Sequence, residues 1–154
     1  MENDILLDSE RVNGVMERVF GETADFTSMV ASLIESEISG IRLYTAIAAR
    51  LGGEPKRTIY AIIRAKRTHL KLLRALYFIK TGKTAEFAPA CAVISGAAEG
   101  IRLQYSAELK LSREYTAAAG FADCDEVRRE FIAMSRISQQ NAYRLLILFK
   151  RTLR

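Results

Sequence analysis

IYAIIRAKRTHLKLLRAL, residues 59–76, is the stretch that decides the fold of this chain. Its apolar residues recur every three or four positions, a pattern typical of an amphipathic α-helix that buries one face. Lys66 and His69 fall on that same face, between Ile62 and Leu73. A buried ammonium group is costly unless a carboxylate pairs with it. The stretch therefore predicts a helix packed in a core that also contains polar groups.

The composition of the whole chain favours one all-α domain. It has 154 residues, 49% of them hydrophobic, with only two prolines and nine glycines. This length suits one domain with a core of its own. The net charge is +5, but 23 basic and 18 acidic residues are interspersed. Such mixing indicates a solvated surface and disfavours nucleic-acid binding.

The sequence shows no recognisable targeting signal and no cysteine motif. The N-terminus has no basic region followed by an apolar stretch, which argues against a signal peptide. No run of about 18 uninterrupted apolar residues predicts a membrane span. Cys91 and Cys124 form neither a disulfide framework nor a paired motif, so we assign them no chemistry. A cytoplasmic protein without membrane association is the expectation.

Glycine positions and apolar periodicity divide the chain into helices. The expected long helices span about residues 25–51, 55–81, 98–119 and 125–152, and a short N-terminal helix over 6–20 ends at Gly21. Residues 83–97 are more than two antiparallel neighbours need as a link, so we expect a crossover there. The resulting division is an N-terminal helical arm over 1–22 and a four-helix bundle over 23–154.

Each long helix has a polar interruption near the middle of its inner face. The interrupting residues are Glu37, Lys66, His69, Glu108, Ser138 and Asn141. Tyr44 follows the first glutamate by seven residues, and Tyr115 follows the second by seven. Seven residues are about two helical turns, so each tyrosine shares a face with its glutamate. The repeat predicts that all these side chains meet at about one height of the bundle, with the tyrosines two turns away.

Four segments carry a resemblance to the rubrerythrin-like ferritin superfamily. They are residues 35–44, 66–69, 107–115 and 138–141, within a resemblance that covers about residues 25–150. In that family the first and third helices each give a glutamate to a di-iron centre, and the second and fourth each give Glu-x-x-His. The resemblance implies a ferritin-like four-helix bundle with one crossover connection, and it places Tyr44 and Tyr115 beside the ligand positions.

The departures from the family pattern change the expected chemistry. Glu37, His69 and Glu108 remain of the six implied ligands. Lys66 and Ser138 stand where the family has bridging glutamates, and Asn141 stands where it has the second histidine. A di-iron centre needs several anionic oxygens. Two carboxylates with a built-in ammonium can instead approach neutrality with no metal. Our hypothesis is that Lys66 replaces the iron electrostatically by bridging Glu37 and Glu108.

Two functions lead, and a basic bundle associated with nucleic acid is a third, weaker alternative. The first is a rubrerythrin-related protein that has lost di-iron chemistry and acts as a structural or interaction module, with no cofactor and no assigned catalytic residue. The alternative is a metalloprotein that binds iron, manganese or zinc through Glu37, His69 and Glu108 and handles peroxide, oxygen or metal ions. In either case we expect a homodimer, because apolar residues are to spare. These are Ile41, Ile63, Leu70 and Phe78.

Overall fold

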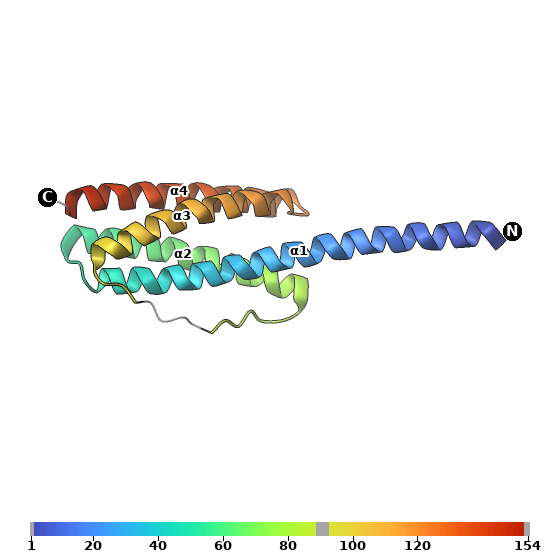
Figure 1. Ribbon diagram of the computed structural model, residues 1–154, viewed down its shortest axis with the longest axis horizontal. Helices are drawn as coiled ribbons and strands as arrows, with labels where there is room; N and C mark the ends of the chain where they lie inside the picture. The colour runs from blue at the N-terminus through green and yellow to red at the C-terminus, as the bar shows by residue number, and fades with distance from the viewer. Residues whose placement is uncertain (1, 89–92, 153–154) are drawn as a thin grey trace.

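The computed structural model is an all-α four-helix bundle, as predicted. It describes residues 2–88 and 93–152, and its side chains over 25–88 and 93–151. The helices are α1 (Glu2–Ala48), α2 (Gly53–Thr81), α3 (Ala97–Gly120) and α4 (Asp125–Thr152) (Figure 1). The described residues contain no β-strand. Three of the four helices begin and end within two residues of their predicted bounds, and α1 differs at both ends.

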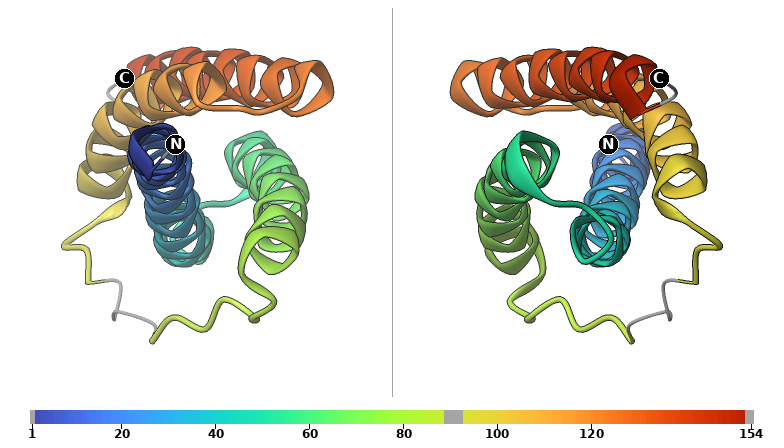
Figure 2. Two further views of the ribbon diagram at one scale, coloured as in Figure 1. Left: turned by 90° about the vertical axis from the view of Figure 1, so that its right-hand side faces the viewer. Right: turned by 90° about the vertical axis from the view of Figure 1, so that its left-hand side faces the viewer.

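Two helical hairpins make up the bundle. Helix α1 packs along α2, and α3 packs along α4, while α1 also contacts α3 and α2 contacts α4. Figure 2 shows this arrangement end on, with the α3–α4 hairpin lying across α1 and α2. The connection from α2 to α3 runs back along the length of the bundle, so these two helices point the same way (Figure 1). The predicted crossover is therefore present, and its described residues contain no helix.

The N-terminal segment differs from the prediction. The sequence predicted a separate short helix ending at Gly21, but α1 runs without a break from Glu2 to Ala48. A glycine inside a helix costs only about 1 kcal/mol relative to alanine, which is too little to end a helix by itself. The N-terminal part of α1 projects well beyond the bundle (Figure 1). The division of the chain at residue 22 is therefore not marked by a helix boundary.

The ends of α2 and α1 are formed in different ways. Gly82 follows α2 with a φ of 68°, and its N–H donates to the carbonyl oxygen of Phe78 at 2.7 Å. This left-handed residue is the usual C-terminal stop of a helix. At the end of α1, the N–H groups of Arg50 and Leu51 bond three residues back instead of four. The helix consequently ends at Ala48, three residues before the predicted end.

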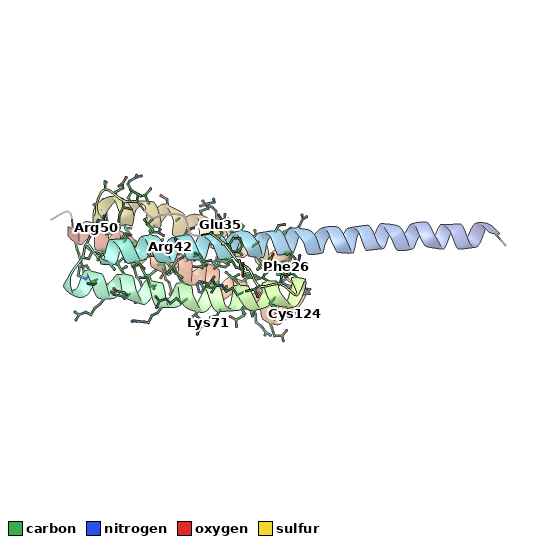
Figure 3. The ribbon with its side chains drawn as sticks, turned by 90° about the horizontal axis from the view of Figure 1, so that it is seen from below. Phe26, Glu35, Arg42, Arg50, Lys71 and Cys124 are labelled. Atoms are coloured by element: carbon green, nitrogen blue, oxygen red, sulfur yellow. The ribbon has the colours of Figure 1, made fainter. Side chains whose placement is uncertain are left out.

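The apolar core is divided into two clusters. One contains Phe26, Leu33 and Phe131, and the other contains Ile47, Ile62 and Leu145. Labelled residues in Figure 3 give the orientation of the bundle, with Phe26 near the end from which α1 projects and Arg50 near the other. The polar residues of the four inner faces lie between the two clusters. The core thus holds a polar layer between two apolar ones.

The apolar residues that we had expected to be spare are mostly used. Ile63 and Leu70 are buried in the core of the single chain, at 1% and 8% exposure, and Ile41 is half-buried against both clusters. Their part in the homodimer argument was therefore wrong. Phe78 is exposed at 56%, so of the four it alone presents a large apolar surface.

Candidate functional site

Lys66 reaches the centre of the polar layer from α2 by passing over Gly40 of α1. A Cβ atom at Gly40 would lie 2.5 Å from Cε of Lys66, which is closer than such atoms can approach. The glycine thus provides the space through which the lysine side chain runs. Lys66 is 1% exposed and is among the largest fully buried side chains of the chain.

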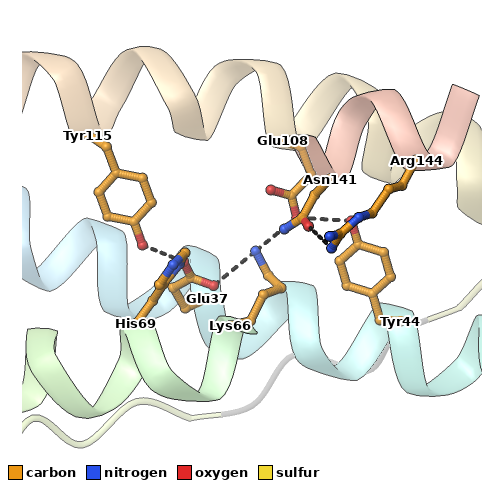
Figure 4. Close-up of polar contacts among 8 residues, drawn as sticks. All are labelled: Glu37, Tyr44, Lys66, His69, Glu108, Tyr115, Asn141 and Arg144. Carbon is orange, nitrogen blue, oxygen red and sulfur yellow. Dashed lines mark hydrogen bonds and ion pairs between the residues drawn. The ribbon is translucent and has the colours of Figure 1, made fainter. Parts of the chain in front are cut away.

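The ammonium group of Lys66 bridges two carboxylates from different helices. Its Nζ lies 2.9 Å from Oε2 of Glu37 on α1 and 3.0 Å from Oε1 of Glu108 on α3 (Figure 4). Both glutamates are buried, at 0% and 1% exposure. The bridge that the sequence predicted is therefore formed. We call these three residues the Glu–Lys–Glu triad.

The two tyrosines complete the triad in a crossed arrangement. The hydroxyl of Tyr44 on α1 donates to Oε1 of Glu108 at 2.9 Å, and the hydroxyl of Tyr115 on α3 donates to Oε1 of Glu37. Each tyrosine therefore serves the glutamate of the other hairpin rather than the one on its own helix (Figure 4). The arrangement follows the internal repeat of the sequence. Both tyrosines are fully buried with their hydroxyls satisfied, as a core position requires.

His69 joins the layer beside Glu37. Its Nδ1 lies 3.1 Å from Oε1 of Glu37, and its ring meets the ring of Tyr115 edge on, with 5.7 Å between the centroids. The histidine is 4% exposed. Glu37 therefore receives three neighbours, one each from Lys66, His69 and Tyr115.

Burial and charge act in opposite directions on the pKa values of Glu37 and Lys66. Burial tends to raise the pKa of Glu37, but the ammonium of Lys66 and the hydrogen bonds from His69 and Tyr115 hold that pKa below its ordinary value. Burial tends to lower the pKa of Lys66, but the two carboxylates raise it above its ordinary value. These shifts favour the carboxylate form of Glu37 and the ammonium form of Lys66 at neutral pH, so Lys66 is too strongly protonated to act as a nucleophile or base.

The tyrosines are held in their neutral form. Burial, followed by the charge of Glu108, raises the pKa of Tyr44 well above its ordinary value. Burial and the charge of Glu37 do the same for the pKa of Tyr115. Both hydroxyls therefore remain hydrogen-bond donors over the whole physiological pH range.

The contribution of α4 to the layer is incomplete. Ser138 and Asn141 are buried, at 1% and 0% exposure, as predicted. Oδ1 of Asn141 accepts a long hydrogen bond from Arg144 at 3.5 Å, and neither residue bonds to the triad. Oε2 of Glu37 is held by its ion pair with Lys66, but other buried polar atoms of the described layer have no hydrogen-bond partner. They are Nε2 of His69, Oε2 of Glu108, Oγ of Ser138 and Nδ2 of Asn141.

The residues present do not fit a di-iron centre. The carboxylate oxygens that would face a metal are already in contact with the ammonium of Lys66, at 2.9 and 3.0 Å. Among the residues that the structure describes, no three His, Cys, Asp or Glu side chains are grouped closely enough to hold a metal ion. Glu37 and His69 touch, while Glu108 contacts the other side of the ammonium group.

Three features of the site were missed from the sequence. One is the passage of Lys66 over Gly40, although a glycine within a helix is itself a sign of a close contact. The second is a hydrogen-bonded link between α3 and α4, in which Oγ of Ser135 lies 3.0 Å from Oγ of Ser112 and donates to its carbonyl at 2.9 Å. The third is a cleft of about 350 Å³ between α1 and α3 that reaches the triad.

The structure describes one of the two cysteines, Cys124, and it takes no part in the site. Cys124 is exposed and free, and Cys91 lies outside the described residues. Within the described chain, no helix has the length and apolar character needed to cross a lipid bilayer.

Comparison with known proteins relates the chain to others through its fold. No family model matches the sequence, and no curated protein matches it. Two solved structures are similar, each with a TM-score of 0.74. One is a hypothetical protein from Pyrococcus furiosus, 20% identical over 83% of this chain and 90% of that one. The other is a conserved hypothetical protein from Mycobacterium tuberculosis, 17% identical over 84% of this chain and 93% of that one. These likenesses concern the four-helix fold alone.

Proposed function

We propose that this chain is a rubrerythrin-related, ferritin-like protein that has lost di-iron chemistry and acts as a structural or interaction module. One observation carries the proposal. The ammonium of Lys66 lies within 3.0 Å of carboxylate oxygens of both Glu37 and Glu108, at the centre of the polar layer. This is where the resemblance implies that a metal would be bound.

An ammonium group can replace the charge of a metal without its reactivity. It supplies +1 and hydrogen-bond donors to two carboxylates, and it has neither a redox couple nor an open coordination position. The remaining partners of the glutamates include the neutral hydroxyls of Tyr44 and Tyr115. Such a layer stabilises the arrangement of helices and supplies no redox chemistry.

Exposed apolar side chains support a role in interaction, including formation of a homodimer. Phe78 and Ile79 near the end of α2 are 56% and 75% exposed, and Phe121 directly after α3 is 49% exposed. Because α2 and α3 point the same way, these residues lie at the same end of the bundle, and α1 projects from that end (Figure 1). Large apolar residues exposed at one end of a molecule offer surface for protein contacts.

Metal analysis tests the proposal. The protein should be purified without a metal-binding tag, and its iron, manganese and zinc contents measured by mass spectrometry. We expect each metal well below one ion per chain. Two irons per chain, together with an absorption band that responds to peroxide, would contradict the proposal.

A gain-of-function variant makes the same test sharper. The Lys66→Glu, Asn141→His double variant restores two ligands that the resemblance implies and removes the competing ammonium. Its metal uptake should exceed that of the wild type. If the uptake of the two proteins is equal, these positions do not line a former metal site.

The second candidate is a metalloprotein with an altered site, and the free Nε2 of His69 favours it. An imidazole nitrogen without a partner, on a ring whose other nitrogen contacts a carboxylate, is the usual arrangement of a metal-bound histidine. Titration of the metal-free protein with Zn²⁺ or Mn²⁺ in a calorimeter tests this candidate. Saturable binding that is lost in His69→Gln would favour it over the metal-free module.

A further inference from the structure

The cleft between α1 and α3 gives solvent a route to the buried triad. It has a volume of about 350 Å³, and its walls include Ser36, Ser39 and Gly40 from α1. These small residues leave space that larger side chains on the same face would fill. Lys66 and Glu108 also line the cleft, although each is only 1% exposed. The triad is therefore buried but lies at the end of an open cleft.

The cleft is negatively charged on a positively charged protein. Its lining carries three carboxylates, from Glu35, Glu108 and Glu114, and two ammonium groups, from Lys66 and Lys110, which leaves a net charge of −1. The whole chain has a net charge of +5. In addition, Lys66 is shared with a further carboxylate, Glu37, behind it. The lining of the cleft thus has a net charge opposite in sign to that of the whole chain, which favours a cation there.

Glu108, which lines the cleft, has one carboxylate oxygen without a hydrogen-bond donor. Oε1 of Glu108 receives the hydroxyl of Tyr44 at 2.9 Å and the ammonium of Lys66 at 3.0 Å. Oε2 of the same carboxylate is buried and has no partner. A buried carboxylate oxygen without a hydrogen-bond donor raises the free energy of the folded protein. A ligand that donates a hydrogen bond to it therefore gains binding free energy.

We propose that the α1–α3 cleft binds a small aliphatic amine. Its ammonium group would donate to Oε2 of Glu108, on the side of that carboxylate away from the bond to Tyr44. The alkyl chain would lie against Leu43 and Leu111, which line the cleft. A second cationic group would lie near Glu35, because Glu114 already pairs with Lys110 at 3.6 Å.

The chemistry of the cleft selects an amine over a metal ion or an anion. A metal ion would require several anionic ligands around one point, whereas an ammonium group needs only oxygen acceptors at hydrogen-bond distance. An anion would meet the three carboxylates of the lining. Glu37 and Glu108 carry two formal negative charges and share one ammonium group, that of Lys66. A second cation would therefore balance the remaining negative charge. This inference rests on the metal-free core proposed above.

Calorimetry with putrescine tests the inference. The full chain should be used, with its metal content measured first, at low salt and with matched sodium chloride and neutral butanediol as blanks. We expect saturable binding of one putrescine per chain and none of butanediol. Glu108→Gln removes the charged acceptor and should raise the dissociation constant roughly tenfold or more. Glu130→Gln on the exposed face of α4 is the matched control and should leave it unchanged.

A second variant keeps the test valid if Glu108→Gln disturbs folding. Ser39 is exposed and lines the cleft, so Ser39→Leu narrows the cleft without touching the triad, and it should abolish binding. Absence of saturable binding by metal-poor wild type, or unchanged affinity in Ser39→Leu, would overturn the inference and leave the proposed function intact. Iron found bound in the purified protein would instead count against the proposed function itself.

Discussion

Replacing Lys66 by methionine tests the central ion pairs directly. Methionine retains much of the volume of the side chain and removes its charge. Both glutamates then remain in the core, at 0% and 1% exposure, without an opposite charge. Removing one member of a buried ion pair costs about 3–5 kcal/mol, because the remaining charge is buried and unpaired.

Protonation of a glutamate limits that cost and gives it a pH dependence. Taking a carboxyl group from an unfolded-state pKa of about 4.3 to the protonated form at pH 7 costs about 4 kcal/mol. If Glu37 and Glu108 then share one proton, the Lys66→Met protein should lose about 4 kcal/mol of its free energy of unfolding at pH 7. At pH 5 the same protonation costs only about 1 kcal/mol. The folded variant binds a proton that its unfolded chain does not, so its deficit shrinks as the pH falls.

Urea unfolding followed by circular dichroism at pH 7 and pH 5 measures both effects. Lys71→Met on the exposed face of α2 is the matched control, and its stability should change by less than about 0.5 kcal/mol. Combining Lys66→Met with Glu37→Gln and Glu108→Gln removes all three charges and should recover most of the loss. A loss below about 1 kcal/mol at pH 7 that does not vary with pH would refute the reasoning. So would a triple variant no more stable than the single one.

The same geometry predicts the effects of other substitutions and of pH. Gly40→Ala should lower the free energy of unfolding by about 1–3 kcal/mol in urea titrations despite its better helix propensity, because Lys66 cannot move away without leaving its carboxylates. Gly120→Ala, whose Cβ would meet nothing within 4 Å, should be neutral or stabilising, and an equal loss in both would contradict the contact. Tyr115→Phe should cost about 1–3 kcal/mol, because Glu37 loses a donor, and an unchanged thermal midpoint would argue against that hydrogen bond. The lowered pKa of Glu37 adds stability that is present above the unfolded value of about 4.3 and is lost as the pH falls through the folded pKa. The raised pKa of Lys66 adds stability that is present below about 10.4 and is lost as the pH rises through the folded pKa. Thermal melts across this range should therefore show stability falling at both acid and alkaline pH. The alkaline fall should be smaller in Lys66→Met but still present, because the raised pKa values of Tyr44 and Tyr115 also contribute to it.

Local signals in the sequence were sufficient for most of the fold. Apolar periodicity located α2, α3 and α4, and Gly82 marked the end of α2 correctly. The same reasoning failed at Gly21, because a glycine ends a helix most readily when its backbone turns left-handed, as at Gly82, and at Gly21 the helix continues. Whether a glycine turns depends on the packing of the neighbouring segments, and the local sequence does not contain that information.

The sequence was enough to predict which charged residues of the candidate site pair, but not the detailed geometry of their contacts. A lysine on a buried face requires carboxylates, so the bridge to Glu37 and Glu108 followed from the residue types and their heights. Three features depend on small differences in the spacing between helices, which the sequence does not reveal. They are the crossing of the tyrosines, the passage of Lys66 over Gly40, and the cleft. The missing partners of Asn141 have the same origin, because shared height in the bundle does not ensure contact.

The polar layer fixes how the two hairpins align. The α2–α3 connection is long and does not set their relative height, and apolar clusters tolerate sliding because their contacts are not directional. The bonds from Tyr44 and Lys66 to Glu108, and from Tyr115 to Glu37, all join one hairpin to the other. Sliding by one residue would move these groups about 1.5 Å and leave charges unpaired in the core. The triad therefore favours one alignment over its neighbours, a role that an apolar core of equal stability would not provide.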